Sequence, residues 1–315
     1  MKNLEKLKHQ ITILCYHGVI ESTPIGYNSS GKHINILEFQ KQIEYISRNF
    51  EVVSMRNIDD YAKNKCSLPK EAVAITFDDG FANNLEIAHK VLTNYDVSAT
   101  IYLATGFISR TKLIWTDSLE RIILEAPVDT PSFSIGPKIY LQFSSRELKE
   151  YSLQTVKKKL KSWSPYKRMT LLKLIEKKIG QEINGIRHNE IHNFLTWDQV
   201  RYMKNSGIWE IGAHTVHHYS LGSLGFLRGQ REIRQSLVRV AKETKSSEVP
   251  LFSYPEGESK DIPKYALDYL RKMGLKSAPS AEPGQNLFPF EEANNYLRLR
   301  RILVGFENMA FPWNL

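Results

Sequence analysis

The sequence predicts an α/β fold in which short buried strands alternate with amphipathic helices. Four apolar runs, bounded by polar or glycine-containing turns, have the length and composition of buried strands: Ile11–Tyr16, Val73–Thr76, Ala99–Leu103 and Trp209–Gly212. Helical patterns lie at Ile36–Arg48, Leu85–Asn94, Trp197–Asn205 and Pro263–Met273. Strands that alternate with helices form parallel β/α units, because each helix returns the chain to the same end of the sheet.

A single domain is expected over residues 1–315. This length exceeds the roughly 100–200 residues of an ordinary domain, but α/β barrels reach it as one unit. Apolar residues make up 42% of the chain and charged residues 24%, which is a globular composition able to bury a sizeable core.

The interval 110–192 breaks the alternation, and we expect a basic helical insertion there. It contains a helical stretch at Trp115–Glu125 and a proline-containing segment at Ala126–Pro137. Basic residues then alternate with apolar ones on helical sequence: Lys157, Lys158, Lys159, Lys161, Lys167, Arg168, Lys173, Lys177 and Lys178, with Leu153, Val156, Leu160, Leu171, Leu172 and Ile175. The simplest interpretation is a solvated face that covers an apolar stripe. The presence of Trp163 and Tyr166 leaves open a helix that docks on an anionic membrane or a phosphate-bearing glycan carrier.

Cysteine usage and the N-terminal sequence favour the cytoplasm. Cys15 and Cys66 are far apart and lack CxxC spacing, so neither a disulfide framework nor a thiolate metal site is indicated. The apolar run Ile11–Tyr16 is too short for a signal-peptide core or a membrane span. We therefore expect a cytoplasmic protein, either free or peripheral to the membrane.

The net charge of +9 suits an acidic partner such as anionic lipid, a phosphorylated glycan carrier or nucleic acid. No RNP, zinc-finger or helix-turn-helix signature accompanies the charge, so no nucleic-acid partner is expected.

Two adjacent carboxylates provide the first candidate site. Asp78 and Asp79 follow the strand Val73–Thr76 and precede Gly80, which places them at the carboxyl end of a parallel strand. That edge is where α/β barrels build active sites. A helix cap or a turn would explain an isolated Asp-Asp-Gly equally well, so the pair is weak evidence by itself.

Two histidines provide the second candidate site. His214 and His218 directly follow the strand Trp209–Gly212, and histidines four apart on one helical turn project to the same side. A single metal ion can bridge that spacing. His217 would point elsewhere on such a turn, so it is left out. The metal hypothesis gains weight because a carboxylate pair ends a different strand.

These motifs resemble the polysaccharide deacetylases of carbohydrate esterase family 4, also called the NodB homology domain. Thr76–Gly80 reads TFDDG, like the family's first motif, and His214–His218 is similar to its second, H[ST]xxH. Ala99–Leu103, Leu195–Asp198 and Phe252–Gly257 look like further family segments. The resemblance covers most of the chain outside the insertion.

The resemblance implies a distorted (β/α) barrel of the NodB type, here with a helical insertion. It implies a hydrolase that removes an N-acetyl group from an amino sugar of a glycan or a glycan precursor. Asp79, His214 and His218 would hold one divalent metal ion, and Asp78 would act as the general base. Zinc is expected first, and the mixed nitrogen and oxygen ligands would also accept Fe, Co, Ni or Mn.

The general acid is assigned by a narrower resemblance. No C-terminal histidine motif of the usual family kind is found, but Leu14–Gly18 contains the pair Tyr16-His17. This pair resembles the YH of the permuted branch that includes the poly-N-acetylglucosamine deacetylases, which implies that His17 protonates the leaving amine. A histidine that merely caps a strand is the alternative.

The chain departs from the family pattern at its third motif. Phe252–Gly257 lacks the arginine that commonly orients the base. Arg301 either replaces it or is a surface arginine of the last strand. Tyr219 and Glu256 stand where proline and an aromatic residue are common in the family. These two changes affect the expected contacts with substrate more than they affect the metal site.

Two other functions compete with N-deacetylation. A deformylase or another amide hydrolase, acting on a lipid-linked sugar or a non-sugar amide, would keep the same metal site. A non-catalytic glycan-binding barrel would keep the fold alone, but the intact set of Asp78, Asp79, His214, His218 and His17 argues against it.

Overall fold

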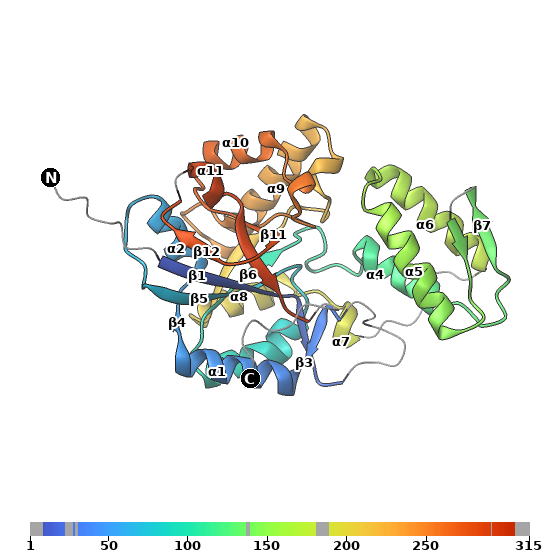
Figure 1. Ribbon diagram of the computed structural model, residues 1–315, viewed down its shortest axis with the longest axis horizontal. Coiled ribbons are helices and arrows are strands. Elements are labelled where there is room, and N and C mark those ends of the chain that lie inside the picture. Colours follow the sequence, from blue (N-terminus) through green and yellow to red (C-terminus); the bar gives the residue numbers. More distant parts are fainter. Residues whose placement is uncertain are drawn as a thin grey trace.

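The computed structural model describes residues 9–22, 28, 31–136, 139–180, 189–290 and 292–305. A curved sheet with helices packed around it occupies most of the molecule, and a helical segment lies beside it (Figure 1). The strands of the sheet are β1 (His9–Tyr16), β4 (Glu51–Val52), β5 (Glu71–Phe77), β6 (Ala99–Leu103), β9 (Trp209–Ala213), β10 (Leu251–Phe252), β11 (Pro279–Pro283), β12 (Asn286–Phe288) and β13 (Leu299–Leu303). All four strands expected from the sequence are present, extended at some ends by one or two residues.

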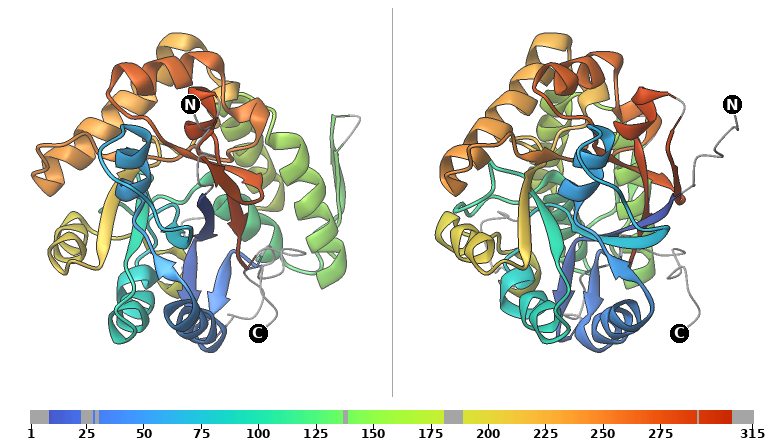
Figure 2. Two further views of the ribbon diagram at one scale, coloured as in Figure 1. Left: turned by 60° about the vertical axis from the view of Figure 1, so that its left-hand side comes forward. Right: turned by 90° about the vertical axis from the view of Figure 1, so that its left-hand side faces the viewer.

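The sheet is almost entirely parallel and curls into a half-barrel (Figure 2). Its strand order is β10-β9-β6-β5-β1-β13-β11, with β4 beside β5 and β12 antiparallel to β1. The fold is thus the expected distorted (β/α) barrel. Its central strands are buried on both faces because helices cover the outside of the sheet, and Ile13, Leu14, Ile75 and Phe77 are at most 1% exposed.

The helices around the sheet are α1 (Ile36–Asn49), α2 (Met55–Ala62), α3 (His89–Asn94), α8 (Trp197–Asn205), α9 (Phe226–Thr244), α10 (Lys264–Lys272) and the short α11 (Ala293–Tyr296). The predicted apolar face of α1 is fully buried through Phe39, Ile43 and Ile46. Thr196 caps α8 with a reciprocal bond to Gln199, which explains why that helix begins where the sequence predicts.

The predicted helix Leu85–Asn94 forms in two parts. A π-helical turn over Asn84–Ala88 precedes α3. The turn places the side chain of Asn84 so that its Nδ2 donates to the carbonyl oxygen of His17 at 3.0 Å. Such turns are common near functional sites because they displace one side chain from regular helical spacing.

The segment from residue 115 to 179 packs as a unit of three helices and a hairpin at one side of the sheet (Figure 1). It comprises α4 (Trp115–Leu124), β7 (Phe133–Ile135), β8 (Ile139–Leu141), α5 (Arg146–Leu160) and α6 (Pro165–Ile179). The antiparallel hairpin was not expected in a helical insertion. The expected apolar stripe is buried, and Lys158, Lys167 and Lys173 are exposed.

Further short elements are β2 (Gly18–Ile20), which pairs with β3 (His33–Asn35), the helix α7 (Asn189–His192), and two 3₁₀ turns, Leu221–Ser223 and Ser259–Asp261. Across the described part of the chain, no helix combines the length and the apolarity that a membrane span requires.

Candidate active site

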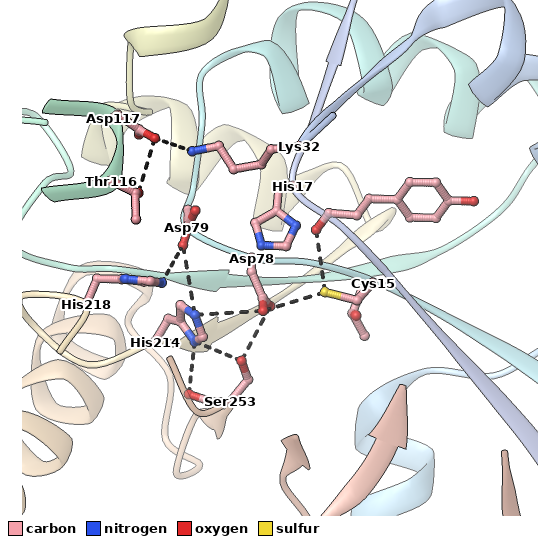
Figure 3. Close-up of polar contacts among 12 residues, drawn as sticks. Cys15, His17, Lys32, Asp78, Asp79, Thr116, Asp117, His214, His218 and Ser253 are labelled. Atoms are coloured by element: carbon pink, nitrogen blue, oxygen red, sulfur yellow. Dashed lines mark hydrogen bonds and ion pairs between the residues drawn. The ribbon is translucent and has the colours of Figure 1, made fainter. Parts of the chain in front are cut away.

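The carboxyl ends of three strands bring the candidate residues together. Tyr16 at the end of β1 pairs in register with Phe77 at the end of β5, so His17 and Asp78 leave the sheet side by side. The backbone N–H of His214, just beyond β9, donates to the carbonyl oxygen of Leu103 at the end of β6. Parallel strands end at one edge, so residues from distant parts of the chain meet there (Figure 3).

Asp79, His214 and His218 converge on one point (Figure 3). One ligand atom from each lies within 4.8 Å of the others. Oδ1 of Asp79 is 3.1 Å from Nε2 of His218 and 3.9 Å from Nε2 of His214. Asp79, His214 and His218 are 3%, 1% and 9% exposed, so this edge of the barrel holds a buried carboxylate beside two imidazoles.

His214 is oriented by the loop after β10. Its Nδ1 lies 3.0 Å from the carbonyl oxygen of Ser253 and 2.8 Å from the hydroxyl of the same residue. Because a carbonyl oxygen can only accept, Nδ1 carries the proton and Nε2 presents its lone pair toward Asp79. Burial lowers the pKa of His214 to about 4, so the ring is neutral at pH 7 and able to bind a metal.

The histidine motif is a loop, and the helical turn assumed from its spacing is wrong. β9 ends at Ala213, and Thr215 and His218 adopt left-handed backbone conformations with φ of 61° and 53°. These two residues curl the chain so that His218 returns to His214. The sequence pattern identified residues that meet, but the backbone that joins them has no helical period.

Glu232 on α9 holds this loop in place. Its Oε2 accepts the backbone N–H groups of Val216 at 3.0 Å and His217 at 2.9 Å. The ring of His217 contacts Oε1 of the same carboxylate at 2.7 Å and is about half exposed. His217 therefore points away from the other two histidines, and its contact with Glu232 helps to hold the loop.

The turn after β5 is conformationally demanding. Asp79 has a φ of 73°, and Gly80 follows with a φ of 92°. A Cβ atom at Gly80 would lie 2.8 Å from the side chain of Leu103 and 2.9 Å from that of Ile108. Only glycine fits here, and a non-glycine residue with positive φ is uncommon enough to mark Asp79 as a positioned group.

Arg301 is buried and binds Asp78. Its guanidinium donates from Nη1 to Oδ1 at 2.9 Å and from Nη2 to Oδ2 at 2.7 Å, and both residues are at most 3% exposed. Burial alone would raise the pKa of Asp78, but the charge of Arg301 outweighs it and holds that pKa well below its usual range. The surface position considered for Arg301 is therefore excluded.

Two contacts of Asp78 have no motif in the sequence. The Ser253 hydroxyl lies 3.4 Å from Oδ1, and the Cys15 thiol lies 3.6 Å from Oδ2. Cys15 is fully buried at the end of β1. A serine and a cysteine of this kind give no sequence signal, because only the neighbouring strands bring them to the carboxylate.

His17 lines the same cavity as the carboxylates. A ring nitrogen of His17, the thiol of Cys15 and a carboxylate oxygen of Asp78 lie within 4.8 Å of one another. The ring lies above Asp78 in Figure 3. Burial lowers the pKa of His17, against the opposing effect of the nearby Asp79 and Asp78.

The cavity above these residues measures about 140 Å³. Asp78, Asp79, His214, His218, His17 and Arg301 contribute to it, together with residues from α4 and α5. Lys157 on α5 and Lys161 just beyond it line the cavity, so these two lysines are not part of a purely solvated surface. Lys161 forms an ion pair with Glu256 at 2.9 Å.

Comparisons with known proteins agree with this arrangement. The polysaccharide deacetylase family profile matches residues 65–278, which is more than half of the chain. The chain belongs to the polysaccharide deacetylase family. No curated protein sequence matches it.

Solved structures share the fold. A deacetylase of Streptococcus pyogenes, solved with acetate, is 18% identical with a TM-score of 0.60, over 96% of this chain and 94% of that one. A de-N-acetylase from Aggregatibacter actinomycetemcomitans is 18% identical with a TM-score of 0.56, over 96% and 97%. A polysaccharide deacetylase from Bacillus cereus is 15% identical with a TM-score of 0.58, over 96% of this chain and 67% of that longer protein.

Proposed function

We propose that the chain is a divalent-metal-dependent hydrolase that removes the N-acetyl group from an amino sugar of a glycan or a glycan precursor. The proposal rests on one observation: a cluster of potential metal ligands and an arginine-bound carboxylate lie side by side in one buried pocket. Asp79, His214 and His218 converge within 4.8 Å, and beside them Asp78 is fixed by Arg301. A ligand set next to an ionised, oriented carboxylate is what hydrolysis of an amide requires.

The ligand set fits one divalent cation. Two imidazoles and a carboxylate are a common donor set for hydrolytic metal sites, and three protein ligands leave room for substrate and water. Zinc is the first candidate, with Fe, Co, Ni or Mn compatible with the same donors. When bound, the ion supplies Lewis-acid polarisation of the amide carbonyl and lowers the pKa of a water molecule beside it.

Asp78 takes a proton from the attacking water. Arg301 keeps the carboxylate ionised and fixes its plane, since both oxygens accept from one guanidinium. The second lone pair of each oxygen is approached by the Ser253 hydroxyl at 3.4 Å or the Cys15 thiol at 3.6 Å, and these long contacts give way when the base accepts the water's proton. Arg301 thus orients Asp78 and still leaves the carboxylate able to accept a proton.

His17 gives a proton to the departing amine. An amine leaves poorly unless it is protonated, and the His17 ring lines the same pocket as the base. Asn84 holds the backbone of His17 through its carbonyl oxygen, which limits how far the ring can move. Burial lowers the pKa of His17, so its protonated ring gives up a proton more readily than the ring of an exposed histidine would.

A cytoplasmic enzyme of this kind would act on a soluble or lipid-linked amino sugar before the glycan is assembled. The exposed lysines of α5 and α6 would then bring it to an anionic membrane surface or a phosphate-bearing carrier.

A panel of acylated sugars tests the proposal. N-acetyl and N-formyl amino sugars, each free, nucleotide-linked and lipid-linked, are incubated with the metal-loaded protein, and released acetate or formate is measured. Acetate release that stops on chelation supports a metal-dependent deacetylase. Formate release alone would reassign the enzyme as a deformylase. Bound metal without release from any member of the panel would leave a glycan-binding barrel.

A further inference from the structure

The α4 and α5 helices close the site from above. Asp78, Asp79, His214 and His218 lie at the base of the cavity and are at most 9% exposed. Thr116, Asp117 and Glu120 of α4, with Lys157 of α5 and Lys161 just beyond it, form part of its wall. Another part comes from Tyr254 and Glu256 of the loop after β10 and from Ala281 of β11.

Two ion pairs connect the helical segment to the loops of the barrel. Lys32, just before β3, binds Asp117 of α4 at 2.5 Å, and these side chains are 12% and 5% exposed. Lys161, just beyond α5, binds Glu256 at 2.9 Å. All four residues line the cavity, so each pair links the helical wall of the cavity to the barrel wall.

Both walls are themselves held by further contacts. On the helical side, the guanidinium of Arg168 on α6 stacks 4.4 Å from the ring centre of Trp115 at the start of α4. On the barrel side, Gly257 follows Glu256, and its carbonyl oxygen accepts the backbone N–H of Ala281 on β11 at 2.8 Å. The ion pairs therefore join two anchored surfaces.

The space that remains is small. The cavity measures about 140 Å³. Pockets for drug-sized ligands are about 300–1,000 Å³. An acyl group and about one sugar ring fill such a space. An internal sugar of a polymer carries a covalent neighbour on each side, and both neighbours need room beyond this cavity, whose two walls the ion pairs join.

We infer that this site selects an acylated amino sugar at a chain terminus or in a small glycoside, and discriminates against internal sugars of a polymer. This inference rests on the proposed function and narrows its substrate class. The selecting elements are the α4–α5 wall and the two ion pairs, Lys32–Asp117 and Lys161–Glu256.

Product mapping on defined oligomers tests the inference. The metal-loaded protein is given N-acetylglucosamine monosaccharide glycosides and pentamers with β-1,4 or β-1,6 links, and the deacetylated positions are located by tandem mass spectrometry. We expect one terminal unit to react at least roughly tenfold faster than any internal unit, a difference of about 1.4 kcal/mol. Equal reaction at internal units would overturn the inference and leave the proposed function standing. Acetate from none of these sugars would overturn the inference, and the proposed function falls with it only if the panel of acylated sugars described above also releases no acetate.

Matched variants show whether the ion pairs are responsible. Asp117→Asn and Lys161→Gln each remove one pair, and both should raise the ratio of internal to terminal reaction. Lys158→Gln is the control, because this exposed neighbour on α5 does not line the cavity. An unchanged ratio in both ion-pair variants would show that the wall does not set the selectivity.

Discussion

Arg301 donates two hydrogen bonds to Asp78 across 223 residues of sequence, at 2.9 Å and 2.7 Å. A third bond, from Nε of Arg301 to the carbonyl oxygen of Ser280 at 2.6 Å, fixes the guanidinium from the opposite side. Both side chains are buried away from water, so each charge is stabilised mainly by the opposite charge of its partner. This dependence makes Arg301 both a structural residue and the group that orients the proposed base.

Arg301→Gln should therefore lower both stability and turnover. Leaving one charge of a buried pair unpaired costs about 3–5 kcal/mol of unfolding free energy. Turnover should fall because the carboxylate loses its fixed plane, while bound metal is retained. Arg300→Gln is the matched control, since Arg300 is exposed on the same strand. Urea unfolding and acetate release measure the two effects, and a folded Arg301→Gln variant with normal turnover would contradict the orienting role.

Removing His214 should abolish metal binding. The site offers three protein ligands, so losing one is expected to remove most of the affinity. Metal analysis of purified His214→Ala checks this. His217→Ala is the control, because its ring contacts Glu232 and the loop keeps its backbone bonds to that carboxylate. Near-stoichiometric metal in His214→Ala would rule out the proposed ligand set.

Asp78→Asn should keep the metal and lose turnover. The amide is nearly isosteric with the carboxylate but cannot accept a proton from water, and loss of a general base costs on the order of 10²- to 10⁴-fold in rate. Metal content and acetate release are measured on the same preparation. Activity close to that of the wild type, with metal bound, would refute the role as base.

His17→Ala should affect amides far more than activated esters. An amine must be protonated to leave, whereas a nitrophenolate leaves without an acid. We expect hydrolysis of an N-acetyl sugar to fall on the order of 10²-fold or more, while cleavage of 4-nitrophenyl acetate changes little. Asp78→Asn is the comparison, since both substrates need the base. Equal losses on the two substrates in His17→Ala would assign His17 a structural role.

The exposed face of α6 should bind anionic vesicles. Tyr166 and Met169 are 78% and 45% exposed, and at helical spacing they share a face with Lys173 and Lys177. Each lysine near an anionic surface contributes about 1 kcal/mol, so binding should weaken as salt rises. Lys157 and Lys161 face the cavity and are left intact.

Vesicle co-sedimentation at low and high salt tests this docking. Lys173→Gln combined with Lys177→Gln should reduce binding. The control removes the same charge from the outer helices through Lys41→Gln and Lys90→Gln. If the wild type does not bind at low salt, the docking proposal is wrong. If both double variants bind equally, net charge and not α6 is responsible.

The local parts of the site could be predicted from the sequence. Asp78 and Asp79 follow a strand recognisable from its apolar run, and Gly80 accompanies them because the turn requires positive φ. The spacing of His214 and His218 also predicts that the two side chains meet, as they do, although the helical turn behind that prediction is absent from the structure. Strand ends and tight turns are determined by residues adjacent in sequence, so a sequence pattern can predict them.

Only the tertiary structure shows which residues from distant parts of the chain complete the site. Arg301 reaches Asp78 only because β13 pairs with β1, which in turn pairs with β5. Lys157 and Lys161 resemble the exposed lysines around them, and only the packing of α5 over the barrel directs them into the cavity. A residue's neighbours in sequence fix its backbone, but strand order and helix packing fix which distant charges it meets. The orientation of the proposed base and the cavity lined by α4 and α5 both result from those long-range contacts.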